Sequence, residues 1–202
     1  MRTASDTSQL VTERIRQSIE IKQTILETDG LLELVGEAAL ACVRSLNRGG
    51  KLILLGNGGS AADAQHLAAE LTGRYLRERR ALPAIALTTN TSCLTAIGND
   101  YSYDDVFSRQ IEAIGNGADI VIGISTSGNS KNVIKALKIA KARGLTTIGL
   151  TGDTGGELLH VADCCLCVPS KETPRIQEAH IMLGHILCEI IEESLTDDRN
   201  LP

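Results

Sequence analysis

The apolar positions near the start of the chain recur at helical spacing. In residues 6–28 they include Ile15 and Ile19, which lie one helical turn apart, and a second run of the same kind covers residues 31–46. Both stretches are followed by glycine, which favours the end of a helix. The pattern therefore predicts a helical hairpin over about residues 6–48, before any strand.

The rest of the chain alternates between two patterns. Short, continuous apolar runs predict five strands at 51–55, 83–87, 118–124, 146–150 and 164–168. Helical patterns lie at 61–77, 131–143 and 173–195. Strands that are apolar throughout and alternate with helices are typical of a parallel sheet covered on both faces. We therefore expect a three-layer α/β fold with a five-stranded parallel sheet, in a single domain over residues 1–202 with an α/β core at about 51–196.

The hairpin carries more apolar surface than an isolated appendage would need. It is either a lid on its own sheet or an oligomer interface formed by helix pairing between copies. The pattern leaves both alternatives open.

Composition narrows the choice of partners. Of 202 residues, 43% are hydrophobic but only 2% are aromatic, so the core must consist of Leu, Ile, Val and Ala. The formal net charge of -5 argues against binding to nucleic acid or to an anionic membrane. No apolar run approaches the roughly 18 residues that a membrane span requires. An anionic substrate would need a local binding site, because the overall field would not attract it.

The N-terminus is polar and has no apolar signal core, so we expect a cytoplasmic protein with reduced thiols. Three of the six cysteines, Cys164, Cys165 and Cys167, include a CxxC spacing. They lie in an apolar run that indicates a buried strand. We therefore favour packing thiols over redox or metal chemistry.

Two polar loops follow predicted strands, where ligands bind in open α/β sheets. The first is the glycine-rich run 56–60, whose backbone can approach a ligand closely, although it could also be a simple tight turn. The second, residues 125–130, carries four hydroxyl groups at the start of a helix. Hydroxyl and backbone N–H groups there can bind phosphate without a cationic side chain. One hydroxyl would suffice to cap the helix, so four favour a phosphate site.

Two helices carry candidate acid–base or metal-binding groups. His66 and Glu70 are four residues apart and share a helix face, as surface pairs also do. Imidazole and carboxylate suit a divalent metal or proton transfer. Gln177 and His185 differ by about 80° around the last helix and about 12 Å along it. They must therefore contact different parts of a site or come from different subunits, and His185 could instead be a structural partner of Glu189.

Four stretches together resemble the phosphoheptose isomerases, which have the sugar isomerase (SIS) fold. They are GNGGSAADAQHLAAELTGR (56–74), AIGNDYSYDDVFSRQ (96–110), GISTSGNSKNVIKAL (123–137) and RIQEAHIMLGH (175–185). The resemblance covers nearly the whole chain, from about residue 10 to 195. It implies interconversion of D-sedoheptulose 7-phosphate and D-glycero-D-manno-heptose 7-phosphate through an enediol, the first step of nucleotide-activated heptose synthesis.

The resemblance also implies a homotetramer with active sites between subunits and one zinc ion per site. Its implied metal ligands are His66, Glu70, Gln177 and His185, of which Glu70 and His185 are also the catalytic acid–base pair. The implied substrate-binding residues are Asn57, Gly58, Gly59, Ser60, Glu70, Thr89, Asn90, Ser125, Thr126, Ser127, Ser130 and Gln177. Asn90 falls where members of the family often carry an aspartate, so it can donate and accept hydrogen bonds but carries no negative charge.

Rival interpretations keep the fold and change the function. A non-catalytic SIS-fold protein, either a sugar-phosphate sensor or a partner of the replication initiator, would share both polar loops. His185 favours an enzyme, because a protein that only binds needs no second proton-transfer group. Another SIS-type activity, on a hexose phosphate or an aminosugar, is a further alternative, and a structural helix-pairing protein would leave the hydroxyl-rich loop without a role.

Overall fold

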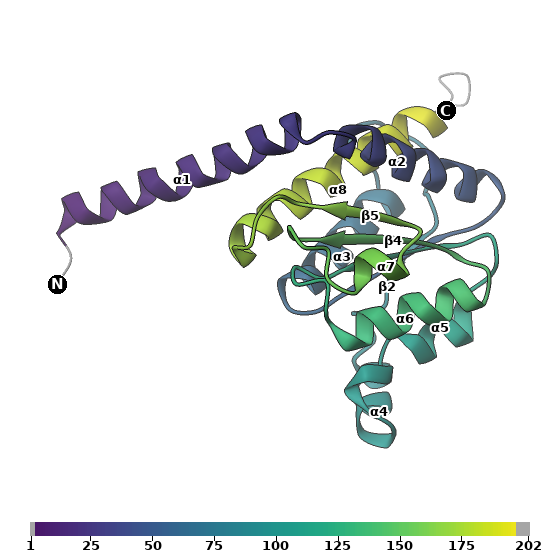
Figure 1. The fold of residues 1–202 in the computed structure, drawn as a ribbon. Coiled ribbons are helices and arrows are strands. Elements are labelled where there is room, and N and C mark those ends of the chain that lie inside the picture. The colour runs from purple at the N-terminus through teal and green to yellow at the C-terminus, as the bar shows by residue number, and fades with distance from the viewer. Residues whose placement is uncertain (1–2, 197–202) are drawn as a thin grey trace.

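The computed structural model describes residues 3–196 and contains a five-stranded sheet in the order β2-β1-β3-β4-β5 (Figure 1). The strands are β1 (Leu52–Gly56), β2 (Ala84–Ala86), β3 (Ile120–Ile124), β4 (Thr146–Thr151) and β5 (Cys164–Cys167). All four strand pairings are parallel. The predicted α/β class and the five parallel strands are confirmed.

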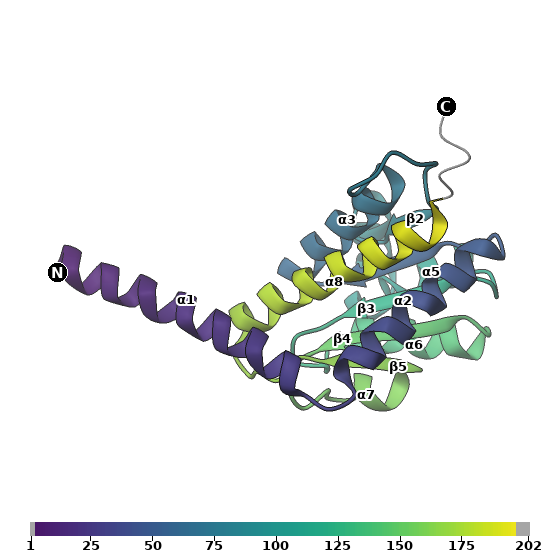
Figure 2. The ribbon, with the colours of Figure 1, turned by 90° about the horizontal axis from the view of Figure 1, so that it is seen from above.

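Helices cover both faces of this sheet (Figures 1 and 2). Along β1, Leu52 and Leu54 pack against α2 (Leu31–Asn47), α3 (Gly59–Thr72) and α8 (Thr173–Leu195). Ile53 and Leu55 point the other way, toward α5 (Ser108–Ile114), α6 (Lys131–Ala142) and α7 (Leu158–Val161). Because successive side chains of a strand face opposite sides, continuous apolar runs fill two cores.

The two predicted N-terminal helices are present, but they do not lie along each other. α2 packs on α8 and the sheet, whereas α1 (Ala4–Glu27) contacts α8 over part of its length, with a hydrogen bond from Arg175 to the carbonyl oxygen of Arg14. The N-terminal part of α1 extends away from the body of the protein (Figures 1 and 2). Ile25, near its C-terminal end, is the one buried residue of α1. A lid on the sheet would have buried the apolar stripe of α1, so the structure does not support that alternative.

Four short elements were not anticipated: α4 (Thr91–Asp100), the 3₁₀ turn Tyr103–Asp105, α5 and α7. α4 has no buried residue, so it lacks the apolar face that a periodicity search detects. In addition, α3 ends at Thr72, five residues before the predicted end. The chain after it is held by hydrogen bonds to α8 that the sequence pattern does not reveal.

The six cysteines are free thiols, with Cys165 buried and Cys164 and Cys167 partly buried. Among the described residues, no helix combines the length and apolar character needed to cross a membrane.

Candidate active site

The two polar loops are neighbours because β1 and β3 are adjacent strands. A side-chain network joins them. The amides of Asn57 and Asn132 exchange two hydrogen bonds of 2.9 Å, and the Tyr103 hydroxyl donates to Asn57 Oδ1 at 3.1 Å. Asn132 is buried at the start of α6. The network therefore fixes the glycine-rich loop against the hydroxyl-rich loop.

The hydroxyl groups of the second loop do not serve as helix caps. Ser130 occupies the N-cap position of α6 but makes no side-chain capping bond; its Oγ lies 2.9 Å from Ser125 Oγ instead. Ser127 Oγ accepts a hydrogen bond from the backbone N–H of Asn129 at 3.1 Å. The N-terminus of α6 has no hydroxyl cap, although Asn132 Oδ1 accepts the backbone N–H of Val133 at 2.9 Å, and it adjoins a loop of hydroxyl groups. This arrangement suits an anion.

The segment 152–158, which follows β4, packs against the hydroxyl-rich loop. Gly128 has a φ of 67°, and a Cβ there would collide with the carbonyl oxygen of Gly155. The backbone N–H of Gly152 donates to Thr126 O at 3.0 Å, and that of Leu158 donates to Gly128 O at 3.0 Å. Only glycine fits at position 128, because it tolerates both the positive φ and the close approach.

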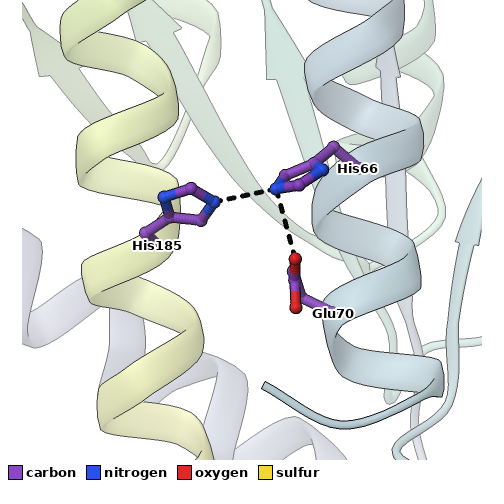
Figure 3. Close-up of side chains that lie close together, drawn as sticks. All are labelled: His66, Glu70 and His185. Atoms are coloured by element: carbon purple, nitrogen blue, oxygen red, sulfur yellow. Dashed lines mark hydrogen bonds and ion pairs between the residues drawn. The ribbon is translucent and has the colours of Figure 1, made fainter. Parts of the chain in front are cut away.

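His66, Glu70 and His185 converge from two helices (Figure 3). His66 Nε2 lies 2.8 Å from His185 Nε2 and 3.2 Å from Glu70 Oε1. His66 and Glu70 come from successive turns of α3, and His185 comes from α8. The side chain of His66 is 48% exposed and that of Glu70 23% exposed, so a small molecule can reach the cluster.

The donor set of this cluster fits a divalent metal ion. One ligand atom from each of the three residues lies within 4.8 Å of the others. Two nitrogen atoms bound to one tetrahedral zinc ion would be about 3.3 Å apart, close to the spacing of the two imidazoles. Such a set of imidazole nitrogen and carboxylate oxygen atoms is typical of zinc but also holds other divalent ions.

Asp63 adds negative charge one helical turn before His66. Burial raises the pKa of its carboxyl group, and the two histidines His66 and His185 oppose that rise. Its Oδ2 is buried and has no hydrogen-bond partner. A cation in the cluster would stabilise the charged form of this carboxylate, which supports the same fit.

Gln177 lies elsewhere in the single chain. A Cβ on Gly59 would be 2.5 Å from Gln177 Nε2, whereas one on Gly184 would be 2.6 Å from Leu67 Cδ1. α3 and α8 therefore run side by side in the same direction, with Gln177 at the end that adjoins the glycine-rich loop. Seven residues separate Gly59 from the cluster residue His66, which is about 10 Å along the helix. Three of the four predicted metal ligands thus meet in one chain, and Gln177 as a ligand stays a prediction that needs a second copy.

The remaining predicted residues have local partners. Asn90 caps α4 by accepting the N–H of Cys93 at 3.0 Å, and Thr89 Oγ1 donates to Ala86 O at 3.1 Å. Ser60 is buried behind the glycine-rich loop, whereas Gly58 and Gly59 are exposed on it. A substrate contact by Asn90 would therefore compete with its capping bond.

Three residues at the site were missed by the analysis of the sequence: Asn132, Tyr103 and Asp63. Asn132 and Tyr103 lie inside two of the four motifs, but their contacts with Asn57 cross 75 and 46 residues of chain. Asp63 could have been found, because it stands three residues before His66 on the same helix face.

Comparisons with known proteins identify the fold and the family of the chain. Residues 13–152 match the family model of the SIS domain, so the fold and its two loops define a sugar isomerase domain. The chain is 57% identical to a phosphoheptose isomerase of Sulfurimonas denitrificans, over 93% of this chain and 96% of that one.

Solved structures give the same result. A phosphoheptose isomerase from Neisseria gonorrhoeae is 46% identical, with a TM-score of 0.87 over 93% of this chain and 99% of its own. One from Francisella tularensis is 37% identical, with a TM-score of 0.88 over 95% of this chain and 100% of its own. The chain belongs to the phosphoheptose isomerase family, as its four motifs predict.

Proposed function

We propose that this protein interconverts D-sedoheptulose 7-phosphate and D-glycero-D-manno-heptose 7-phosphate, and so begins the synthesis of nucleotide-activated heptose. The observation that carries the proposal is the convergence of His66, Glu70 and His185 at an accessible cluster. Relatives that bear the name phosphoheptose isomerase support the choice of substrate.

The chemistry requires a proton to move between C1 and C2 of the sugar. Glu70 is the proposed base: its carboxylate takes the proton from C1 of the ketose and returns it at C2 of the enediol. His185 is proposed to move protons between the two hydroxyl oxygens. A divalent cation, which we propose is zinc, would polarise the carbonyl group when held by His66, Glu70 and His185.

The ends of the site suit a long sugar phosphate. We propose that Ser125, Thr126, Ser127 and Ser130 bind the phosphate, and that Asn57, Gly58 and Gly59 line the path of the sugar. The predicted contact of Ser60 with the sugar is not part of this proposal, because this residue is buried behind the loop. The cluster lies about 10 Å along α3 from Gly59, so a bound sugar would extend from the loops along α3 toward the cluster.

The test is isomerisation in deuterated water, followed by NMR. We expect the protein to convert sedoheptulose 7-phosphate, to exchange one C1 proton for deuterium, and to act far more slowly on sedoheptulose without phosphate. Treatment with a chelator should abolish turnover, and added zinc should restore it. Binding of the heptose phosphate without exchange would favour the sensor, while turnover of a hexose phosphate alone would favour another SIS activity.

We also propose that the protein is a cytoplasmic homotetramer whose active sites lie between subunits. The exposed stripe of α1 supports this proposal: Val11, Ile15, Ile19 and Leu26 are 53%, 56%, 49% and 68% exposed. Exposed apolar stripes of this size usually mark a surface that a partner covers. A second copy would also be the source of the Gln177 ligand that a single chain does not deliver to the cluster.

Replacing both Ile15 and Ile19 with Glu is therefore expected to dissociate the assembly and to reduce turnover. If two α1 helices paired, the four introduced carboxylates would lose their water without gaining a positively charged partner, which opposes the pairing. Light scattering coupled to gel filtration measures the mass. Thr24→Glu is the matched control, because residue 24 lies about 180° around α1 from Ile15. An assembly of unchanged mass in the double variant would contradict the interface.

A further inference from the structure

The connection from α3 to β2 is built around a buried ion pair. The side chains of Arg79 and Glu192 are both 2% exposed, and Arg79 Nε lies 3.0 Å from Glu192 Oε1. The same carboxylate accepts the backbone N–H groups of Tyr75, Leu76 and Arg77, at 2.9, 2.7 and 2.9 Å. Glu192 of α8 therefore organises the chain that leaves α3.

Arg79 also binds the end of α3. Its guanidinium donates to the carbonyl oxygens of Glu70 at 2.8 Å, Leu71 at 2.9 Å and Gly73 at 2.9 Å. The last carbonyl groups of a helix have no partner within the helix, so a buried arginine satisfies them. Because α3 carries Glu70 and α8 carries His185, the Arg79–Glu192 pair fastens together the two helices that supply the cluster.

This anchored loop places Tyr75 on the cluster. The Tyr75 ring stacks on His185, with centroids 5.6 Å apart and an interplanar angle of 27°. His66 meets the same imidazole edge-on, with centroids 5.0 Å apart and an angle of 62°. Among the described residues, the Tyr75 hydroxyl has no hydrogen-bond partner, so the contact is made by the ring.

We infer that Tyr75 is a positioning residue that holds the His185 imidazole toward His66 and Glu70, from a loop fixed by the Arg79–Glu192 pair. The expected effect on turnover rests on the proposed function. The role of Tyr75 in orienting the His185 imidazole does not depend on it. Hydrogen-bonded partners that orient a ligating histidine typically change metal affinity 10–100-fold when they are removed, and we expect a stacked ring in the same role to have an effect of that order.

The experiment compares Tyr75→Leu and Tyr75→Met, which lack the ring, with Tyr75→Phe, which keeps it. Zinc affinity of the metal-free protein is measured by competition with a chromogenic chelator, and kcat and KM are measured with sedoheptulose 7-phosphate. We expect both non-aromatic variants to lose about 10–100-fold in zinc affinity and to fall in kcat with little change in KM. Tyr75→Phe should retain the zinc affinity and the kcat of the wild type.

Leu76→Ala is the matched control, because Leu76 lies in the same loop but is 60% exposed. Thermal unfolding of all variants separates positioning from a general loss of structure. Wild-type zinc affinity and kcat in folded Tyr75→Leu or Tyr75→Met would overturn the inference, and so would a Tyr75→Phe variant as impaired as these two. If the wild-type protein binds zinc but does not isomerise the sugar, the proposed function fails while the affinity comparison still tests Tyr75.

Discussion

Replacing Glu70 with Gln is expected to lower turnover about 10²–10⁴-fold, the usual contribution of a positioned acid–base group. The amide keeps the size of the side chain but cannot accept the C1 proton. Glu70 Oε1 lies 3.2 Å from His66 Nε2, so the substitution removes a negative charge from the cluster. It opens no cavity, because the glutamate and glutamine side chains have the same size. The folded structure should persist, because the side chain of Glu70 is partly exposed and the helix remains capped by Arg79.

The measurement is exchange of the C1 proton into deuterated water at saturating substrate, with the zinc content of each sample determined in parallel. Variant protein loaded with zinc to the level of the wild type should still fail to exchange the proton. Glu78→Gln makes the same chemical change at a side chain that is 73% exposed, and should leave exchange unchanged. Exchange at the wild-type rate in Glu70→Gln would remove this carboxylate from the catalytic residues.

The parts of the fold that the sequence predicts are those governed by local patterning. Four of the strands are continuous apolar runs, and β4 combines an apolar centre with threonines at both ends. The start of α6 is marked by a change from hydroxyl residues to helical periodicity. α4 escaped prediction because Leu94 and Ile97 are its only apolar side chains packed on a core, and both are only partly buried. Helix propensity and hydrophobic periodicity do not predict such a helix.

The site shows the same division. The two loops and the His66–Glu70 pair are visible because their residues are close in the chain. The remaining contacts depend on packing across the fold: His185 meets His66 over 119 residues, and Asn57 meets Asn132 over 75. The parallel course of α3 and α8 also separates Gln177 from His185, which the spacing along one helix anticipates.

Glu192→Gln is expected to lower the free energy of unfolding by about 3–5 kcal/mol at neutral pH, the usual cost of breaking a buried ion pair. The loss would leave the Arg79 guanidinium buried without a counter-charge. It would also weaken three backbone hydrogen bonds, because a neutral amide oxygen is a poorer acceptor than a carboxylate. Urea unfolding at one fixed protomer concentration measures the difference, since assembly contributes to stability.

The pH dependence identifies the cause of that loss. Burial raises the pKa of Glu192, but the N–H groups of Tyr75, Leu76 and Arg77 and the charge of Arg79 outweigh it, so the pKa lies below the ordinary value of 4.5. A depressed pKa stabilises the folded state above the unfolded value, and this stability is lost as the pH falls through the folded pKa. The difference in unfolding free energy between the wild type and Glu192→Gln should therefore be constant near neutral pH and decrease below about pH 4.5.

Glu193→Gln is the matched control, since Glu193 forms an ion pair with Arg77 but is 57% exposed. Exposed pairs contribute about 0–1 kcal/mol, so this variant should unfold almost as the wild type does at every pH. A Glu192→Gln deficit that stays the same from neutral to acidic pH would show that packing, rather than the charge of Glu192, holds the loop between α3 and β2 against α8.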